Sequence, residues 1–256
     1  MRRKGQSSTP AEGGPGRTYA SGAVLVRALL RIVARREWRG ARHLPRQGAH
    51  IVVINHISHV DPFAYGHFQY KNGLPPRFLV KSSLFSVPVV GAFLRATGQI
   101  PVERNSHRAA DALHAAAAAL ERGRCVAIYP EGTLTKDPDL WPGRPKTGAA
   151  RLALTTGVPV IPVAQWGSHQ ILPPYGNGKR RLLPRPTLVV AAGPPVDLSD
   201  FHGADLTVPV LREASERIMA AVTELLEEIR EEKRPTRGTG SASASRLHDE
   251  DGSPHQ

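Results

Sequence analysis

The chain has 256 residues, 40% of them hydrophobic, which is enough material for one large α/β domain or two small ones. Its formal net charge is +12, and its single cysteine, Cys125, excludes an internal disulfide framework. No stretch is long and apolar enough to be assigned as a transmembrane helix, and the basic start lacks the pattern of a cleavable signal.

The positive charge is concentrated near the N-terminus. Residues 1–50 hold eleven Lys and Arg against two Glu, so they carry nine of the twelve net charges. Such an asymmetry predicts an anionic partner, either a nucleic acid or a membrane surface. The low aromatic content, 5%, argues against a platform on which nucleic-acid bases stack.

Residues 1–18, rich in Gly, Ser and Pro, are expected to be disordered, and residues 19–38 to form an amphipathic helix in a membrane interface. One face of this helix is apolar, and arginines recur at intervals of four on another: Leu25, Val26, Leu29, Ile32 and Val33, with Arg27, Arg31 and Arg35. Anionic headgroups attract such a basic stripe. The alternative is an ordinary helix packed on its own domain, with the arginines facing water.

A histidine and an aspartate follow the first predicted strand, residues 50–54. His56 and Asp61 are five apart, whereas helix partners meet at three or four. They can therefore meet only in a loop, or in a loop that turns into a helix, and the cap formers Asn55 and Ser58 favour a helix start here. A carboxylate fixes the tautomer of an imidazole that acts as a general base, and it stabilises the charged form of that imidazole. The alternative is a polar loop tying down its own backbone, with His59 as a rival partner for Asp61.

Strand and helix patterns alternate from here to a tail at residues 235–256 that is expected to be disordered. The fold class is therefore predicted as α/β, one domain over residues 39–234 with a largely parallel mixed sheet flanked by helices. The predicted strands span 50–54, 77–80, 98–102, 124–129, 159–163 and 187–192, and the predicted helices span 62–70, 84–95, 106–122, 146–156 and 208–233.

Cationic or glycine-rich groups follow three later strands, where α/β proteins bind ligands. Lys81 follows residues 77–80, and Arg104, whose guanidinium suits phosphate, follows residues 98–102. After residues 124–129 come Glu131, Gly132 and Thr133, a turn whose backbone N–H groups suit an anion. Lys146 opens a helix, whose start also favours anions. Each group alone has an ordinary reading as a turn or a solvated surface residue.

Four blocks in this order resemble the glycerophospholipid acyltransferase family, specifically the 1-acylglycerol-3-phosphate (lysophosphatidic acid) acyltransferases. The family carries Asn-His-x4-Asp, Gly-x-Ile-x3-Arg, Pro-Glu-Gly-Thr and Val-Pro-Val-Ile-Pro-Val. They stand here at 55–61, 98–104, 130–133 and 158–163. The third block departs from the family pattern, because Leu134-Thr135-Lys136 follows where an Arg is usual; Lys136 is the candidate replacement for that charge. The departure bears on the identity of the acceptor more than on the reaction type.

The resemblance implies acyl transfer from an acyl thioester, either acyl-CoA or acyl-carrier protein, to the hydroxyl of lysophosphatidic acid in phospholipid biosynthesis. His56 would be the general base and Asp61 its partner, and Arg104, with Lys81 and the Glu131–Thr133 turn nearby, would hold the phosphate. No metal and no resident cofactor are implied. The expected place is the cytoplasmic face of the cell membrane, as a peripheral or monotopic protein.

Three alternatives follow from the same residues. Glycerol 3-phosphate or another lysolipid is an alternative acceptor. A basic nucleic-acid-binding protein would explain the charge, although the arginines share their predicted helix with apolar neighbours as a membrane helix requires. A metal-dependent hydrolase would use some of the eleven His, but His56 and His59 are three apart with no Glu between them.

Overall fold

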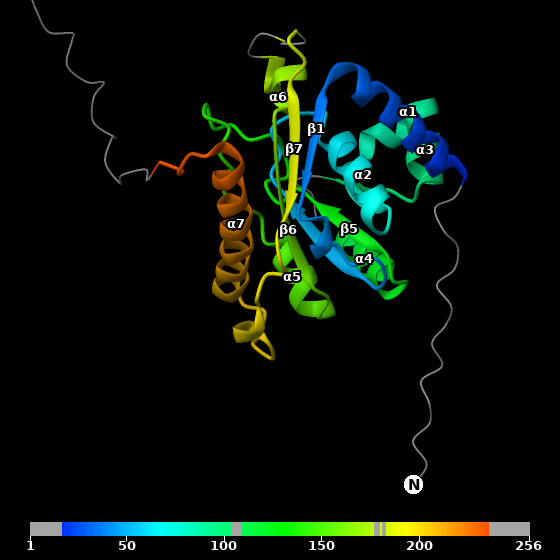
Figure 1. The fold of residues 1–256 in the computed structure, drawn as a ribbon. Helices are drawn as coiled ribbons and strands as arrows, with labels where there is room; N and C mark the ends of the chain where they lie inside the picture. The colour runs from blue at the N-terminus through cyan, green and yellow to red at the C-terminus, as the bar shows by residue number, and fades with distance from the viewer. Residues whose placement is uncertain (1–16, 104–108, 177–179, 181–182, 236–256) are drawn as a thin grey trace, which may run out of the picture.

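A seven-stranded sheet organises the protein in a computed structural model that describes residues 17–103, 109–176, 180 and 183–235 (Figure 1). The strand order is β1-β7-β6-β2-β5-β3-β4, and every neighbouring pair in this described sheet is parallel except β6 and β7. The strands are β1 (Arg35–Arg39), β2 (His50–Ile54), β3 (Pro76–Lys81), β4 (Ile100–Val102), β5 (Cys125–Ile128), β6 (Val160–Trp166) and β7 (Thr187–Ala192).

Helices cover both faces of the sheet. They are α1 (Arg17–Val33), α2 (Asp61–Asn72), α3 (Pro88–Ala96), α4 (Ala109–Glu121), α5 (Gly148–Thr156), α6 (Ser168–Ile171) and α7 (Val208–Arg230), with a 3-10 turn at Ser82–Ser86 before α3. Side chains of α4, α5 and α7 pack into one core, and those of α1 and α2 into another. The predicted fold class, a single α/β domain with a mostly parallel mixed sheet, is confirmed.

The central strand β2 shows why this sequence forms a sheet buried on both sides. Its four apolar residues are fully buried and alternate between the faces, as the period of two in a strand requires. Ile51 and Val53 enter the core under α4, α5 and α7, whereas Val52 and Ile54 enter the core under α1 and α2. A continuous apolar run is typical of such a strand.

The last helix, α7, packs an apolar stripe against the domain. Leu211, Ile218 and Val222 on α7 are buried, and Leu225 and Ile229 pack against the cluster that contains Trp141. The remaining predicted elements appear with shifts of a few residues at their described ends, and residues 106–108 of one predicted helix lie outside the described residues. The predicted tail, residues 235–256, lies outside the described residues except for Pro235, and so do residues 1–16 at the other end.

The predicted helix over residues 19–38 is wrong at its C-terminal end. The helix α1 ends at Val33, and residues 35–39 form the edge strand β1, in parallel register with β7 from Arg35 opposite Thr187. Four of these five residues are charged, so no local apolar pattern marks a strand. Pairing with β7 specifies it, and Trp38 anchors it with its ring centroid 5.8 Å from that of Phe68.

The apolar face predicted on α1 is divided between the core and the surface. Val26 and Val33 pack with the buried Leu30 against the domain, as the packed-helix alternative expects. Leu25, Leu29 and Ile32 are exposed. None of the described helices has both the length and the apolar character needed to cross a membrane.

Candidate active site

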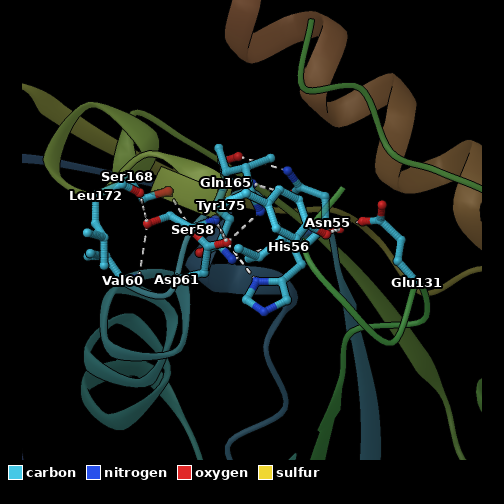
Figure 2. Close-up of polar contacts among 12 residues, drawn as sticks. Asn55, His56, Ser58, Val60, Asp61, Glu131, Gln165, Ser168, Leu172 and Tyr175 are labelled. Carbon is cyan, nitrogen blue, oxygen red and sulfur yellow. Dashed lines mark hydrogen bonds and ion pairs between the residues drawn. The ribbon is translucent and has the colours of Figure 1, made fainter. Parts of the chain in front are cut away.

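The loop after β2 brings His56 and Asp61 into contact. The Nδ1 atom of His56 lies 2.9 Å from Oδ2 of Asp61, the first residue of α2, and both side chains are buried (Figure 2). The spacing of five works because four loop residues precede the helix, as the sequence required. The predicted contact is therefore confirmed, and the catalytic role of the pair stays a prediction.

Asp61 is held by donors from three directions. Its Oδ2 also accepts the backbone N–H groups of Ile57, at 2.7 Å, and Ser58, at 2.8 Å. Its Oδ1 accepts the hydroxyl of Ser168, the first residue of α6. Because an ionised carboxylate offers only acceptors, Nδ1 of His56 carries the hydrogen in this contact. The lone pair on Nε2 is then available to take a proton.

The imidazole ring is also fixed from its face. The ring of Tyr129 stacks on His56 with centroids 4.1 Å apart. Burial raises the pKa of the Tyr129 hydroxyl well above its ordinary value, so this ring stays neutral. His59, the rival considered for Asp61, sits edge-on to His56 at 6.4 Å between centroids and is exposed. Asp61 is thus the partner of His56.

Glu131 holds the backbone of His56. Its Oε1 accepts the backbone N–H of His56 at 3.1 Å, and its Oε2 accepts that of Gly143 at 2.8 Å. Burial raises the pKa of this carboxyl, while the bonds from Gly143 and His56 act in the opposite direction. The prediction placed this side chain beside a substrate phosphate; both of its oxygens instead accept main-chain donors from the protein.

Asn55 fastens the same loop to β6, and Ser58 fastens it to the end of α6. The side chain of Asn55 donates to the carbonyl of Gln165 at 3.0 Å and accepts its N–H at 2.8 Å, which ties the end of β2 to β6. The hydroxyl of Ser58 donates to the carbonyl of Leu172 at 2.7 Å. These secondary candidates are therefore buried supports of the loop.

An apolar cavity of about 670 Å³ opens beside His56. It lies between α2, α3 and the inner side of α1, and apolar side chains dominate its wall. Its polar lining residues include Lys81, Thr133 and Tyr175. The main apolar lining residues are Val26, Phe78, Leu79, Leu84, Val90, Phe93 and Leu94.

The predicted phosphate-binding residues are gathered in part. Lys81 and Thr133 both line the cavity and are exposed. Gly132 has a left-handed backbone (φ 72°), and its N–H donates to the carbonyl of Tyr129 at 3.0 Å. A Cβ on Gly132 would lie 3.1 Å from the side chain of Lys146, so these two residues are adjacent. Lys136 is exposed and is not among the cavity-lining residues. Arg104 lies outside the described residues.

Three residues of the site were not predicted: Ser168, Tyr129 and Tyr175. Ser168 follows Gly167, whose left-handed backbone (φ 91°) turns the chain just after β6. The strand-end rule that selected the other candidates would have selected this Gly-Ser pair. Tyr175 donates to the carbonyl of Leu134 at 2.6 Å and lies 3.4 Å from Oγ1 of Thr133. No motif in the sequence signals that contact.

Within the described residues, no three His, Cys, Asp or Glu side chains are grouped so that they could hold a metal ion.

Comparisons with known proteins identify the family of the chain. The chain is 34% identical over 131 residues to a 1-acyl-sn-glycerol-3-phosphate acyltransferase of Borreliella burgdorferi, covering 51% of this chain and 50% of that protein. It is 32% identical over 142 residues to a chloroplastic enzyme of the same name from Brassica napus, covering 55% and 40%. The chain thus spans about half or less of the length of these curated relatives.

A structural comparison supports the same fold. The crystal structure of the 1-acyl-sn-glycerophosphate acyltransferase PlsC from Thermotoga maritima matches with a TM-score of 0.60 at 24% identity, covering 81% of this chain and 79% of that one. The family model named Acyltransferase matches residues 35–166, from β1 through β6, and so includes the loop with His56 and Asp61. The chain belongs to the acyltransferase family.

Proposed function

We propose that this protein transfers a fatty acyl group from an acyl thioester to the free hydroxyl of lysophosphatidic acid, which gives phosphatidic acid. The observation that carries the proposal is the bond from His56 Nδ1 to Asp61 Oδ2, 2.9 Å, beside an apolar cavity of about 670 Å³. The names of the Borreliella and Brassica relatives support lysophosphatidic acid as the acceptor.

The reaction proceeds by proton transfer and acyl exchange. Nε2 of His56 takes the proton of the acceptor hydroxyl as its oxygen attacks the thioester carbonyl, while Asp61 stabilises the imidazolium that forms. Collapse of the tetrahedral intermediate breaks the carbon–sulfur bond, and the thiolate leaves with the proton from His56. No metal and no resident cofactor take part; acyl-CoA or acyl-carrier protein is a co-substrate.

The acyl chain occupies the apolar cavity, which removes its surface from water at roughly 0.8 kcal/mol per methylene. Lys81, with Arg104, Lys146 and the Gly132–Thr133 turn, binds the phosphate of the acceptor. Lys81 and Thr133 support this assignment because they line the same cavity as His56. Lys136 is kept as an outer candidate for that charge.

The proposed location is the cytoplasmic surface of a membrane that contains anionic lipids, where the protein is bound peripherally. No nucleic acid is a proposed partner. The exposed apolar residues Leu25, Leu29 and Ile32 on α1, with Val89 and Phe93 on α3, support this proposal. Gly22 of α1 lies against the ring of Phe93, so the two exposed surfaces adjoin beside the cavity. A lipid substrate in the bilayer would have a short path to His56.

An acyl-transfer assay on purified protein tests the function. It measures thiol release with lysophosphatidic acid, glycerol 3-phosphate and a neutral lysolipid as acceptors, and Lys81→Ala is run beside wild type. We expect the fastest turnover with lysophosphatidic acid. For Lys81→Ala we expect a higher KM with little change in kcat, because Lys81 would hold the acceptor phosphate equally in the ground state and in the transition state. Faster turnover with another acceptor would reassign the substrate within the same reaction type.

A further inference from the structure

A second hollow, separate from the cavity, is lined almost entirely by cations. Its volume is about 440 Å³, and six of its eight lining residues are basic: Arg27, Arg31, Arg35, Arg36, Lys71 and Arg185, with Ala34 and Trp38. No carboxylate is among these described lining residues. Burial, followed by the charges of Arg31 and Arg27, lowers the pKa of the Arg36 guanidinium.

Four separate segments build this hollow. Arg27 and Arg31 come from α1, and Arg35 and Arg36 from β1. Lys71 comes from the last turn of α2, and Arg185 from the segment before β7. Figure 1 shows α1, β1 and α2 together on one side of the molecule. A set of like charges drawn from four segments repels itself, so an anion that neutralises it would stabilise the arrangement.

The hollow is separated from the cavity by His67, and it lies away from His56 and Asp61. Nη1 of Arg36 is 3.2 Å from Nε2 of His67, and His67 lines the cavity from its other side. Lys71 is ten residues beyond Asp61 on the same helix, so about 15 Å separates them along its axis at 1.5 Å per residue. A ligand in the hollow would therefore not occupy the place of the reacting hydroxyl.

The surface next to the hollow identifies the kind of anion. At 100° per residue, Val24 lies on the same face of α1 as Arg27 and Arg31, and it is 68% exposed. A phosphate in the hollow would have this exposed apolar side chain at its edge. An anionic phospholipid has this pairing of phosphate and hydrocarbon, whereas free phosphate and nucleic acid lack the hydrocarbon.

We propose that this hollow, Arg27–Arg31–Arg35–Arg36–Lys71–Arg185, is a binding site for the phosphate headgroup of one anionic phospholipid, distinct from the acyl-transfer site. It refines the proposed membrane location but does not depend on acyl transfer. The lipid bound there is a fixed partner of the protein. It would hold the end of α1 against β1 and α2 and so orient the cavity toward the bilayer.

Three charge-matched double variants test the site. Arg27→Gln/Arg31→Gln removes two cations on α1, and Lys71→Gln/Arg185→Gln removes two that lie outside α1. Arg151→Gln/Arg212→Gln removes two exposed cations from α5 and α7, which cover the other face of the sheet. Titration calorimetry with dihexanoyl phosphatidylglycerol below its micelle concentration, dihexanoyl phosphatidylcholine and inorganic phosphate measures binding. Sedimentation with vesicles containing phosphatidylglycerol provides the bilayer arm.

We expect one phosphatidylglycerol bound per chain, with affinity about thirtyfold weaker in both hollow variants and within about threefold of wild type in the control variant. Phosphatidylcholine should bind far more weakly, and His56→Ala should bind as wild type does, whatever its acyl-transfer rate.

Three results would overturn the proposal. Equal weakening in the control variant would mean a diffuse charge effect. No weakening in Lys71→Gln/Arg185→Gln would reduce the site to a stripe on α1. Inorganic phosphate bound as tightly as the lipid, with vesicle binding unchanged in the hollow variants, would make the ligand a free phosphate.

Discussion

The hydroxyl of Ser168 donates to Oδ1 of Asp61 from 107 residues further along the chain, and Asp61 Oδ2 accepts Nδ1 of His56. The contact joins the end of β6 to the start of α2 and makes a three-membered chain of polar groups, all buried. The position of the proposed base therefore depends on a residue outside its own loop.

Replacing Ser168 by Ala should lower kcat by about tenfold, because Asp61 would lose a hydrogen bond that holds its carboxylate in place against His56. The unfolding transition is measured beside kcat. A purely structural role for Ser168 would lower the amount of folded protein and leave kcat per folded enzyme at the wild-type value.

Glu131→Gln tests the brace on the His56 backbone. The amide nitrogen of Gln cannot accept a hydrogen bond, so one of the N–H groups of His56 and Gly143 would lose its acceptor. We expect kcat to fall by about tenfold, since His56 would be less well held. Wild-type kcat in this variant would show that the brace is dispensable for the reaction.

The same variant should change how stability depends on pH. The pKa of Glu131 is raised by burial above 4.5, so over the range above 4.5 the folded chain binds this proton more tightly than the unfolded chain does. The contribution of this residue to stability is therefore lost as pH rises through its folded-state pKa. The free energy of unfolding in urea, measured from pH 4 to pH 7, should fall more steeply with pH in wild type than in Glu131→Gln.

His67 should make the protein sensitive to acid. Burial, and then the charges of Arg36, Lys71 and Arg27, lowers the pKa of this side chain from 6.5 to about 4. Between these values the unfolded chain binds a proton that the folded chain does not, so stability falls as pH decreases. His67→Gln keeps an acceptor for Arg36 and should lose less stability between pH 7 and pH 5 in urea unfolding. An equal loss in both proteins would contradict this assignment.

The cavity makes a prediction about acyl-chain length. Val26 lines the cavity, whereas Leu29, one turn further along α1, is 53% exposed. Val26→Trp would fill part of the space and should shift the preference of the reaction toward shorter acyl thioesters. Leu29→Trp, with the same new side chain on the outer arc, should leave the preference unchanged. A panel of acyl donors measures the shift, and the same preference in both variants would place the acyl chain elsewhere.

The sequence predicted the sheet and the contact between His56 and Asp61 because both leave local signals. Strands such as β2 are continuous apolar runs, and His56 and Asp61 stand together in one short loop. The edge strand β1 leaves no such signal, because four of its five residues are charged. It forms by pairing with β7. The roles of Ser168 and Glu131 were missed for a related reason: each acts on a residue far away in the chain, 107 and 75 positions respectively.

The rate of thiol release by His56→Ala, measured with lysophosphatidic acid and an acyl thioester, tests the account most directly. His114→Ala, an exposed histidine on α4, is the matched control. We predict a loss of about 10²–10⁴-fold in kcat for His56→Ala, with an unchanged unfolding transition and wild-type kcat for His114→Ala. A His56→Ala rate within a few fold of wild type would contradict the assignment of this imidazole as the base.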